Sequence, residues 1–115
     1  MATKYDRGRR AEWRLRDQLE AGGWTVIRAA GSKGPYDLVA FPRVNFNDDR
    51  VVAIQVKTTS SPVTARALLK AFQPQSEKAY VTQLWIWHAR QWTMVRWDDE
   101  DQAKRTHTMW PVDKT

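Results

Sequence analysis

The chain has 115 residues, no cysteine, and 19 Lys and Arg against 13 Asp and Glu, which gives a net charge of +6. The lack of cysteine excludes disulfides, a zinc–thiolate site and a cysteine nucleophile, and no apolar run approaches the roughly 20 residues of a membrane span. The isoelectric point of about 10.0 indicates a nucleic-acid partner. The charged start has no apolar stretch behind it, so no secretory signal is expected.

The first predicted element is a helix over residues 4–21, which ends at Gly22-Gly23. At about 100° per residue, one face carries Tyr5, Gly8, Glu12, Leu15 and Leu19. The opposite side carries Arg7, Arg10, Arg14 and Asp17. Glu12 therefore lies in the apolar stripe, where a lone carboxylate is costly unless it is paired or binds a metal. Pairing with Arg16, four residues later, is the structural alternative.

Three strands are predicted next, over residues 24–28, 36–41 and 51–57, separated by a Gly/Pro-rich loop and a turn region. Alternation places Asp37, Val39 and Phe41 on one side of the second strand. The third strand has a nearly continuous apolar run and is expected to be buried on both faces. Gln55 and Lys57 point the same way at its end.

The second half is predicted to contain a helix over 63–73, bounded by Pro62 and Pro74, and a hairpin of strands 80–88 and 91–97 around Ala89-Arg90. Residues 98–101 are expected to form a solvated acidic turn, and the tail from about 102 to 115 has no clear pattern. We expect a single α/β domain over 1–115, with a mixed central sheet flanked by helices. The core and a subunit interface are the expected places of Trp85, Trp87, Trp92 and Trp97, with base stacking as the alternative. His88 is expected at an exposed hairpin end without a role.

Four side chains form a candidate catalytic set, namely Glu12, Asp37, Gln55 and Lys57. They converge if the second and third strands are neighbours in the sheet. Oxygen ligands suit Mg²⁺, which polarises a phosphoryl oxygen. Lys57 can orient or deprotonate a water and stabilise developing negative charge. The set therefore predicts a metal-dependent DNA nuclease.

The ordered residues also resemble the PD-(D/E)xK nuclease superfamily and, more closely, the archaeal-type Holliday junction resolvases with their viral and phage relatives. The resemblance covers about residues 7–60. It rests on Glu12, on Arg28 after the WTVIR segment, on the AGSKGPYD loop that ends in Asp37, and on the Gln55-Val56-Lys57 tripeptide. It implies a restriction-endonuclease-like fold and a homodimer that binds four-way DNA junctions and nicks them symmetrically.

The resemblance also implies roles for individual residues. The metal, Mg²⁺ with Mn²⁺ as a substitute, would be held by Glu12, Asp37, Gln55 and the backbone carbonyl of Val56, with Lys57 as the catalytic lysine. Arg28 and Ser32 match family residues near the scissile phosphate. The DNA-binding candidates are four of the five arginines of the first helix, with one arginine and one lysine that follow, namely Arg7, Arg9, Arg10, Arg14, Arg28 and Lys33.

Gln55 departs from the family pattern, which has Glu at this position. An amide oxygen still ligates a hard cation, but without formal charge, so a lower metal affinity is expected. Two alternatives to a junction resolvase follow. One is a general nuclease of the repair or restriction type, and the other is a non-cleaving junction-binding module, natural or engineered. In each case the expected location is the cytoplasm, with nucleoid or viral DNA.

Overall fold

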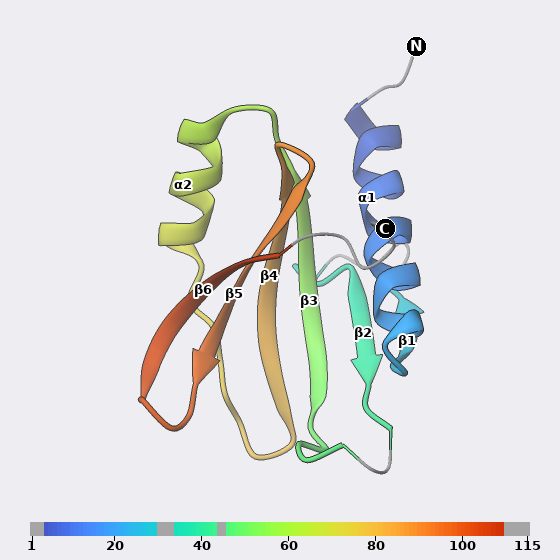
Figure 1. Ribbon diagram of the computed structural model, residues 1–115, viewed down its shortest axis with the longest axis vertical. Helices are drawn as coiled ribbons and strands as arrows, with labels where there is room; N and C mark the ends of the chain where they lie inside the picture. The colour runs from blue at the N-terminus through green and yellow to red at the C-terminus, as the bar shows by residue number, and fades with distance from the viewer. Residues whose placement is uncertain (1–3, 30–33, 44–45, 110–115) are drawn as a thin grey trace.

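The fold is built on a six-stranded mixed sheet (Figure 1). The computed structural model describes residues 4–29, 34–43 and 46–109. Their elements, in chain order, are α1 (Lys4–Ala21), β1 (Thr25–Arg28), β2 (Leu38–Phe41), β3 (Val51–Thr58), α2 (Pro62–Ala71), β4 (Tyr80–His88), β5 (Gln91–Asp98) and β6 (Ala103–Met109). Strands pair in chain order, and only β3 and β4 are parallel. Parallel neighbours need a crossover, which α2 provides. The predicted α/β architecture is confirmed, and it is compatible with a restriction-endonuclease-like fold.

The predicted end of the first helix is confirmed by its hydrogen bonds. Gly23 has a φ of 100°, a left-handed conformation that glycine adopts without steric cost. The N–H of Trp24 donates to the carbonyl of Leu19 at 3.1 Å, and the N–H of Gly23 donates to that of Glu20 at 3.0 Å. This is the Schellman arrangement, which satisfies carbonyls at a helix end and turns the chain into β1.

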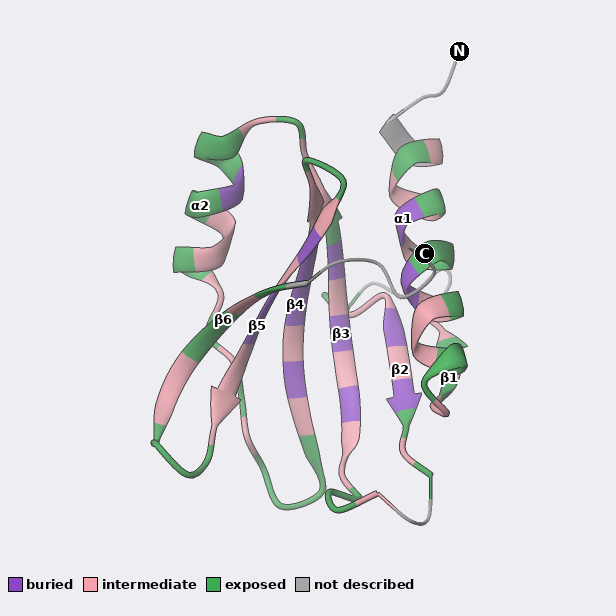
Figure 2. Ribbon diagram, viewed as in Figure 1, coloured by how far each residue is buried: buried purple, intermediate pink, exposed green. Residues whose placement is uncertain are grey.

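Two hydrophobic cores lie on the two faces of the sheet (Figure 2). On one face α1 packs its buried Ala11 and Leu15 against the sheet. On the other face α2 packs Ala65 against Leu84, Ile86 and Val95. The prediction that β3 is buried on both faces was wrong, because its burial alternates and only Val52, Ile54 and Val56 are buried. The reason is that α2 packs on β4, which leaves the other face of β3 partly open.

The predicted outward side of α1 also needs correction. Arg14 was expected to point away from the apolar stripe, but its guanidinium carbon lies 4.4 Å from the centre of the Trp87 ring. The buried stripe is centred on Ala11 and Leu15. At 100° per residue, positions 7 and 14 lie only about 40° and 60° from position 11 around the helix. Their long side chains therefore flank the buried stripe and reach back over the sheet.

The tail contains a strand that the sequence pattern did not predict. Ala103–Met109 forms β6, which pairs antiparallel with β5 from Asp98↔Ala103 to Trp92↔Met109. None of the residues 103–108 is buried. The strand therefore shows no hydrophobic alternation, and its backbone pairing with β5 holds it in place.

The hairpin between β4 and β5 has the predicted two-residue turn. Ala89 and Arg90 have φ values of 54° and 59°, as in a type I′ turn. Trp85 and Trp92 are buried, and their rings meet edge to face with centroids 5.9 Å apart. The expectation that these tryptophans belong to the core is confirmed.

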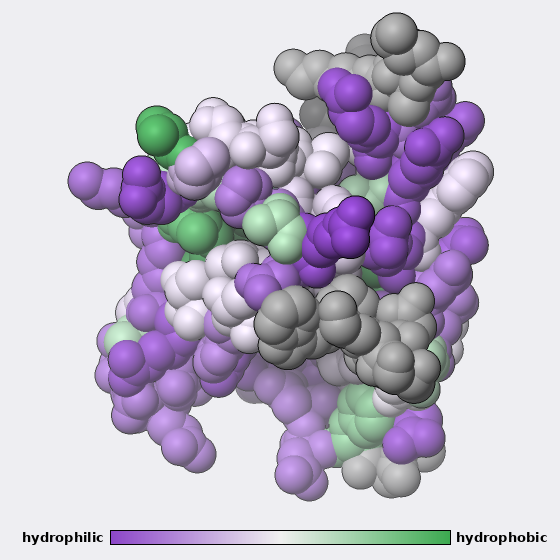
Figure 3. All heavy atoms as spheres, turned by 45° about the horizontal axis from the view of Figure 1, so that its top comes forward, coloured by the Kyte–Doolittle hydropathy of each residue, from purple (hydrophilic) through white to green (hydrophobic). Residues whose placement is uncertain are grey.

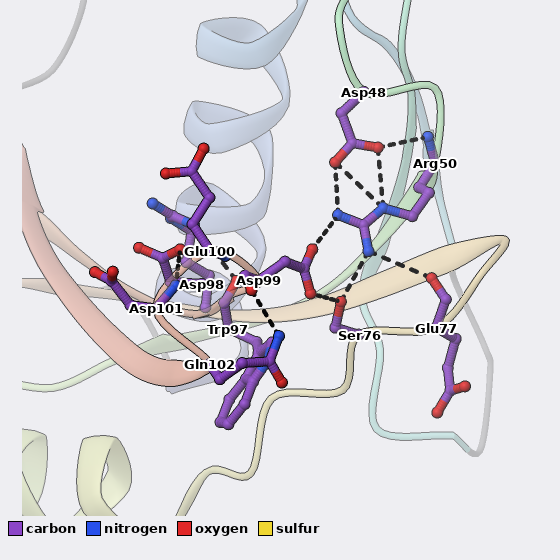
Figure 4. Close-up of polar contacts among 11 residues, drawn as sticks. Asp48, Arg50, Ser76, Glu77, Trp97, Asp98, Asp99, Glu100, Asp101 and Gln102 are labelled. Carbon is purple, nitrogen blue, oxygen red and sulfur yellow. Dashed lines mark hydrogen bonds and ion pairs between the residues drawn. The ribbon is translucent and has the colours of Figure 1, made fainter.

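A polar cluster joins three loops at the end of the sheet where β3 begins (Figure 4). The Arg50 guanidinium donates to Asp48 Oδ2 and Asp99 Oδ2, both at 2.7 Å, and to Ser76 Oγ at 2.8 Å. Ser76 Oγ in turn donates to Asp99 Oδ1 at 2.6 Å. Asp99 belongs to the acidic turn predicted to be merely solvated, and this cluster gives it a structural role.

Hydrogen bonding perturbs the acid–base properties of this cluster. The Arg50 guanidinium, by hydrogen bonding, holds the pKa of Asp48 below its ordinary value of 3.8. The pKa of Asp99 is lowered as well, first by the hydrogen bond from Ser76 and then by that from Arg50. The two carboxylates correspondingly raise the pKa of Arg50. The charged form of all three groups is therefore favoured in the folded protein.

Candidate active site

Asp37 lies alongside the end of β3, just before β2 begins. Its backbone N–H donates to the carbonyl of Ile54, and its own carbonyl accepts from the N–H of Ala29, both at 2.8 Å. Its carboxylate Oδ2 accepts the N–H of Val56 at 2.8 Å. The side chain thus takes the place of a backbone partner where β2 no longer pairs with β3. These bonds fix the carboxylate beside the Gln55–Lys57 segment.

Gln55 and Lys57 point from β3 into one open pocket of about 360 Å³. Gln55 is half-buried and Lys57 is exposed. The pocket lies between α2 and the sheet, and its lining also includes Pro35, Tyr36, Leu68, Ala71, Phe72, Gln73 and Leu84. Its largely apolar wall lowers the local dielectric, which strengthens the field of the Lys57 ammonium. The predicted shared orientation of Gln55 and Lys57 is confirmed.

Glu12 forms an ion pair with Arg28, the last residue of β1. Arg28 Nε donates to Glu12 Oε1 at 2.8 Å, and the Glu12 side chain is only 16% exposed. The alternative pairing of Glu12 with Arg16 is wrong, because Arg16 pairs with Asp17 and Glu20. The ion pair with Arg28 offsets the free-energy cost of burying the Glu12 carboxylate on the inner face of the helix.

The sheet separates this ion pair from the pocket. Val26, two residues before Arg28 on the same face of β1, packs into the core beneath α1. Gln55 and Lys57 leave the opposite face of the sheet. Arg28 pairs in register with Leu38, the neighbour of Asp37, so both groups lie at the same end of the sheet. Asp37, Gln55 and Lys57 are thus brought together, and the Glu12–Arg28 pair lies on the α1 side of the sheet.

The oxygen atoms at this end of the sheet are of the type that hard divalent cations prefer as ligands. Asp37 supplies a carboxylate and Gln55 an amide oxygen. The carbonyl of Val56 faces the side of β3 on which Asp37 lies, because the N–H and C=O of one strand residue point to the same neighbour. Across the described ranges, no group of three or more His, Cys, Asp or Glu side chains gathers around one point.

The predicted DNA-binding arginines of α1 divide into two groups. Arg7, Arg10 and Arg14 line a second pocket of about 220 Å³ together with Ala11, Thr58 and Trp87. Arg9 lies outside it, with its guanidinium carbon 5.2 Å from the centre of the Trp13 ring. The predicted residues Ser32 and Lys33 lie outside the described residues.

Sequence patterns did not reveal two features of this end of the molecule, namely the Thr58–Trp87 pair and the surroundings of His88. Thr58 and Trp87 are register partners in β3 and β4, and they line the pocket of the three arginines. His88, expected at an exposed hairpin end, is half-buried, with Nδ1 2.9 Å from the carbonyl oxygen of Thr59. No local signal joins positions 58 and 87 to a helix near residue 10, so only the fold could identify them.

Comparison with known proteins identifies the family. The family model described as archaeal Holliday junction resolvase (Hjc) matches residues 3–67, more than half of the chain. The chain therefore belongs to the archaeal Holliday junction resolvase family. The family implies a nuclease that acts on branched DNA junctions. No curated protein and no solved structure matches the chain.

The family match spans α1, β1, β2, β3 and the first half of α2. It includes Glu12, Arg28, Asp37, Gln55 and Lys57, whereas β4, β5 and β6 lie beyond it.

Neither helix of the described chain is long and apolar enough to cross a membrane.

Proposed function

We propose that the chain is an endonuclease that resolves four-way DNA junctions by metal-dependent hydrolysis of phosphodiester bonds. One observation carries the proposal: Asp37, tied to the N–H of Val56 at 2.8 Å, lies beside the segment that directs Gln55 and Lys57 into one pocket. Membership in the resolvase family supports junction DNA as the substrate. The chain acts as one nuclease domain in this proposal, in the cytoplasm and in contact with nucleoid or viral DNA.

Each residue of the site has a proposed task. Asp37, Gln55 and the Val56 carbonyl would hold Mg²⁺, or Mn²⁺ in its place, with Glu12 as a further ligand from α1. When bound, the cation polarises a phosphoryl oxygen of the scissile phosphate. Lys57 stabilises the negative charge that develops on the phosphate and orients the attacking water.

Arg28 and the remaining basic residues would position the DNA. Arg28 fixes the Glu12 carboxylate through the 2.8 Å hydrogen bond and brings a guanidinium to the same end of the sheet as Asp37. In the proposal it also contacts the scissile phosphate together with Ser32. Lys33 and four arginines of α1, namely Arg7, Arg9, Arg10 and Arg14, contact the DNA backbone, which supplies affinity without sequence preference.

A homodimer completes the proposal. A four-way junction has two equivalent strands to cut, and two copies related by a two-fold axis present two equivalent sites. Symmetric nicking therefore requires one active site from each copy. Analytical ultracentrifugation of the protein with one junction would show two chains per junction, and a single chain per junction would contradict symmetric cutting.

The decisive experiment compares substrates. The protein is incubated with Mg²⁺ and either a labelled four-way junction or a linear duplex of the same sequence. Symmetric nicks in the junction alone are expected, and Asp37→Asn should remove them while junction binding in EDTA persists. Equal cutting of the linear duplex would instead favour a general nuclease of the repair or restriction type. No cutting of either DNA would contradict the proposed activity.

Gln55 favours one further candidate, a junction-binding module that does not cleave. The amide has no formal charge to attract a cation, so a carboxylate here would strengthen metal binding. We expect Gln55→Glu to lower the Mg²⁺ concentration needed for half-maximal cleavage. A wild-type protein that binds junctions tightly but cuts only after Gln55→Glu would establish the non-cleaving module.

A further inference from the structure

The pocket of about 220 Å³ between α1 and the end of the sheet has the composition of an anion site. Arg7, Arg10 and Arg14 line it, and all three are exposed. In the part of the chain that the structure describes, none of them forms an ion pair with a carboxylate. Three guanidinium groups around one pocket repel one another, and a bound anion would relieve that repulsion.

The contact between Arg14 and Trp87 indicates whether the pocket can bind a base or a phosphate of a nucleic acid. The guanidinium carbon lies over the indole at 4.4 Å from the ring centre, and the same ring meets Trp92 edge to face at 5.1 Å. The Trp87 ring is therefore engaged on its face by an arginine and offers no free platform for a base. A stacked guanidinium keeps its N–H edges available, so the pocket presents donors for a phosphate.

The position of the pocket relative to Lys57 separates it from the proposed cleavage site. Thr58 lines the arginine pocket and Lys57 lines the other one, so consecutive residues of β3 contribute to pockets on opposite faces. Figure 3 looks toward this end of the molecule and shows hydrophilic side chains gathered on the side where α1 lies. Two phosphate-binding surfaces on opposite faces of one sheet end suit DNA arms that diverge from a branch point.

We propose that Arg7, Arg10 and Arg14, with Thr58 and Trp87 as the floor, bind a backbone phosphate of a junction arm other than the arm that is cut. This inference rests on the proposed function for the identity of the DNA. Such a contact favours branched DNA over a linear duplex, because a linear duplex has no second arm for the pocket to hold.

The test measures binding without cleavage. The affinity of Arg10→Gln/Arg14→Gln for a four-way junction and for a linear duplex is measured by fluorescence anisotropy in EDTA. Arg66→Gln/Lys78→Gln, which removes the same charge from exposed positions elsewhere, is the matched control. We expect the pocket variant to bind the junction about tenfold more weakly, as for the loss of charge-assisted hydrogen bonds, and the linear duplex at most roughly threefold more weakly.

Two further measurements sharpen the result. The slope of log affinity against log salt for the junction should fall by about one in the pocket variant, as expected for one lost phosphate contact. Arg14→Lys keeps the charge but loses the planar group over Trp87, so we expect weaker junction binding at unchanged net charge. Full affinity in Arg14→Lys would overturn the stacked geometry.

The outcomes separate this inference from the proposed activity. Junction binding weakened no more than in the control would overturn the pocket as a DNA site. An equal loss for junction and linear duplex would overturn the assignment to a second arm. A wild-type protein that fails to cut but loses junction affinity with the pocket variant would contradict the nuclease proposal alone.

Discussion

Arginine has opposite surroundings at the two ends of β3. Where the strand begins, Arg50 is held by Asp48, Asp99 and Ser76, and its side chain is only 20% exposed. Where the strand ends, Arg10 and Arg14 are exposed and line a pocket without an acidic partner among the residues that the structure describes. Eight strand residues, about 26 Å at 3.3 Å each, separate the two ends.

Whether an arginine of this protein has acidic partners indicates whether its role is structural or ligand-binding. The charge of Arg50 is neutralised by its neighbours, so it joins loops and has little field left for a ligand. Among the described residues, Arg10 and Arg14 have no acidic partner, so their charges act on a ligand that approaches. Acidic residues surround the Arg50 end and should repel DNA, which orients a junction toward the end that carries Asp37 and Lys57.

The largest expected effect is at the Lys57 end. Lys57→Ala should lower the cleavage rate of a saturated junction at least about 100-fold, because it removes a positive charge from the reacting phosphate. Its unfolding free energy should stay within about 0.5 kcal/mol of the wild type, because the side chain is exposed. Lys78→Ala, an exposed lysine in the loop before β4, is the control and should cut normally. An unchanged rate in Lys57→Ala would refute its catalytic assignment.

Arg50→Ala should show the reverse pattern. It removes the donor that joins Asp48, Asp99 and Ser76, and we expect a loss of about 2 kcal/mol of unfolding free energy in urea titrations. Junction cleavage per folded molecule should be retained. Arg105→Ala, which removes a more exposed arginine paired with two carboxylates, should cost less. A larger loss in Arg105→Ala would contradict the importance of the Arg50 cluster.

The pH dependence of the Arg50 cluster gives a smaller effect. The pKa values of Asp48 and Asp99 are lowered in the folded protein, so their contribution is fully present above about pH 4, near the ordinary carboxyl value. It is lost as the pH falls through the lowered values. The stability difference between the wild type and Arg50→Ala should therefore shrink as the pH is lowered below about 4. A difference that stays constant over this range would show that packing, rather than charge, holds Arg50.

The smallest expected effect concerns the hairpin turn between β4 and β5. Ala89 and Arg90 adopt positive φ values of 54° and 59°, which cost energy for residues with a Cβ atom. Ala89→Asn/Arg90→Gly supplies residues that suit a type I′ turn and should raise the unfolding free energy by about 1 kcal/mol. Arg90→Ala, which removes the charge but keeps the strain, should give no such gain in thermal denaturation. A gain in Arg90→Ala would mean that charge repulsion is relieved instead.

Local pattern was sufficient for most elements of the fold. The Gly22-Gly23 stop, the hairpin at Ala89-Arg90 and the alternation that directs Gln55 and Lys57 to one side all depend on neighbours within a few residues. The family was likewise indicated by an ordered set along the chain, which the match over residues 3–67 confirms: Glu12, Arg28, the AGSKGPYD loop with Asp37, and the Gln55-Val56-Lys57 tripeptide. β6 was missed because its pairing with β5, rather than its own residues, holds it.

Local sequence properties thus indicated the family and the candidate site residues, because residue type and alternation depend on near neighbours in the chain. Only the tertiary structure decided their partners. It paired Glu12 with Arg28 across 16 residues, tied Asp37 to the N–H of Val56, and placed Arg14 over Trp87. It also enclosed Arg50 and left Arg7, Arg10 and Arg14 exposed. Such pairings depend on which strands are neighbours and which face a helix covers, and these follow from the packing of the whole sheet.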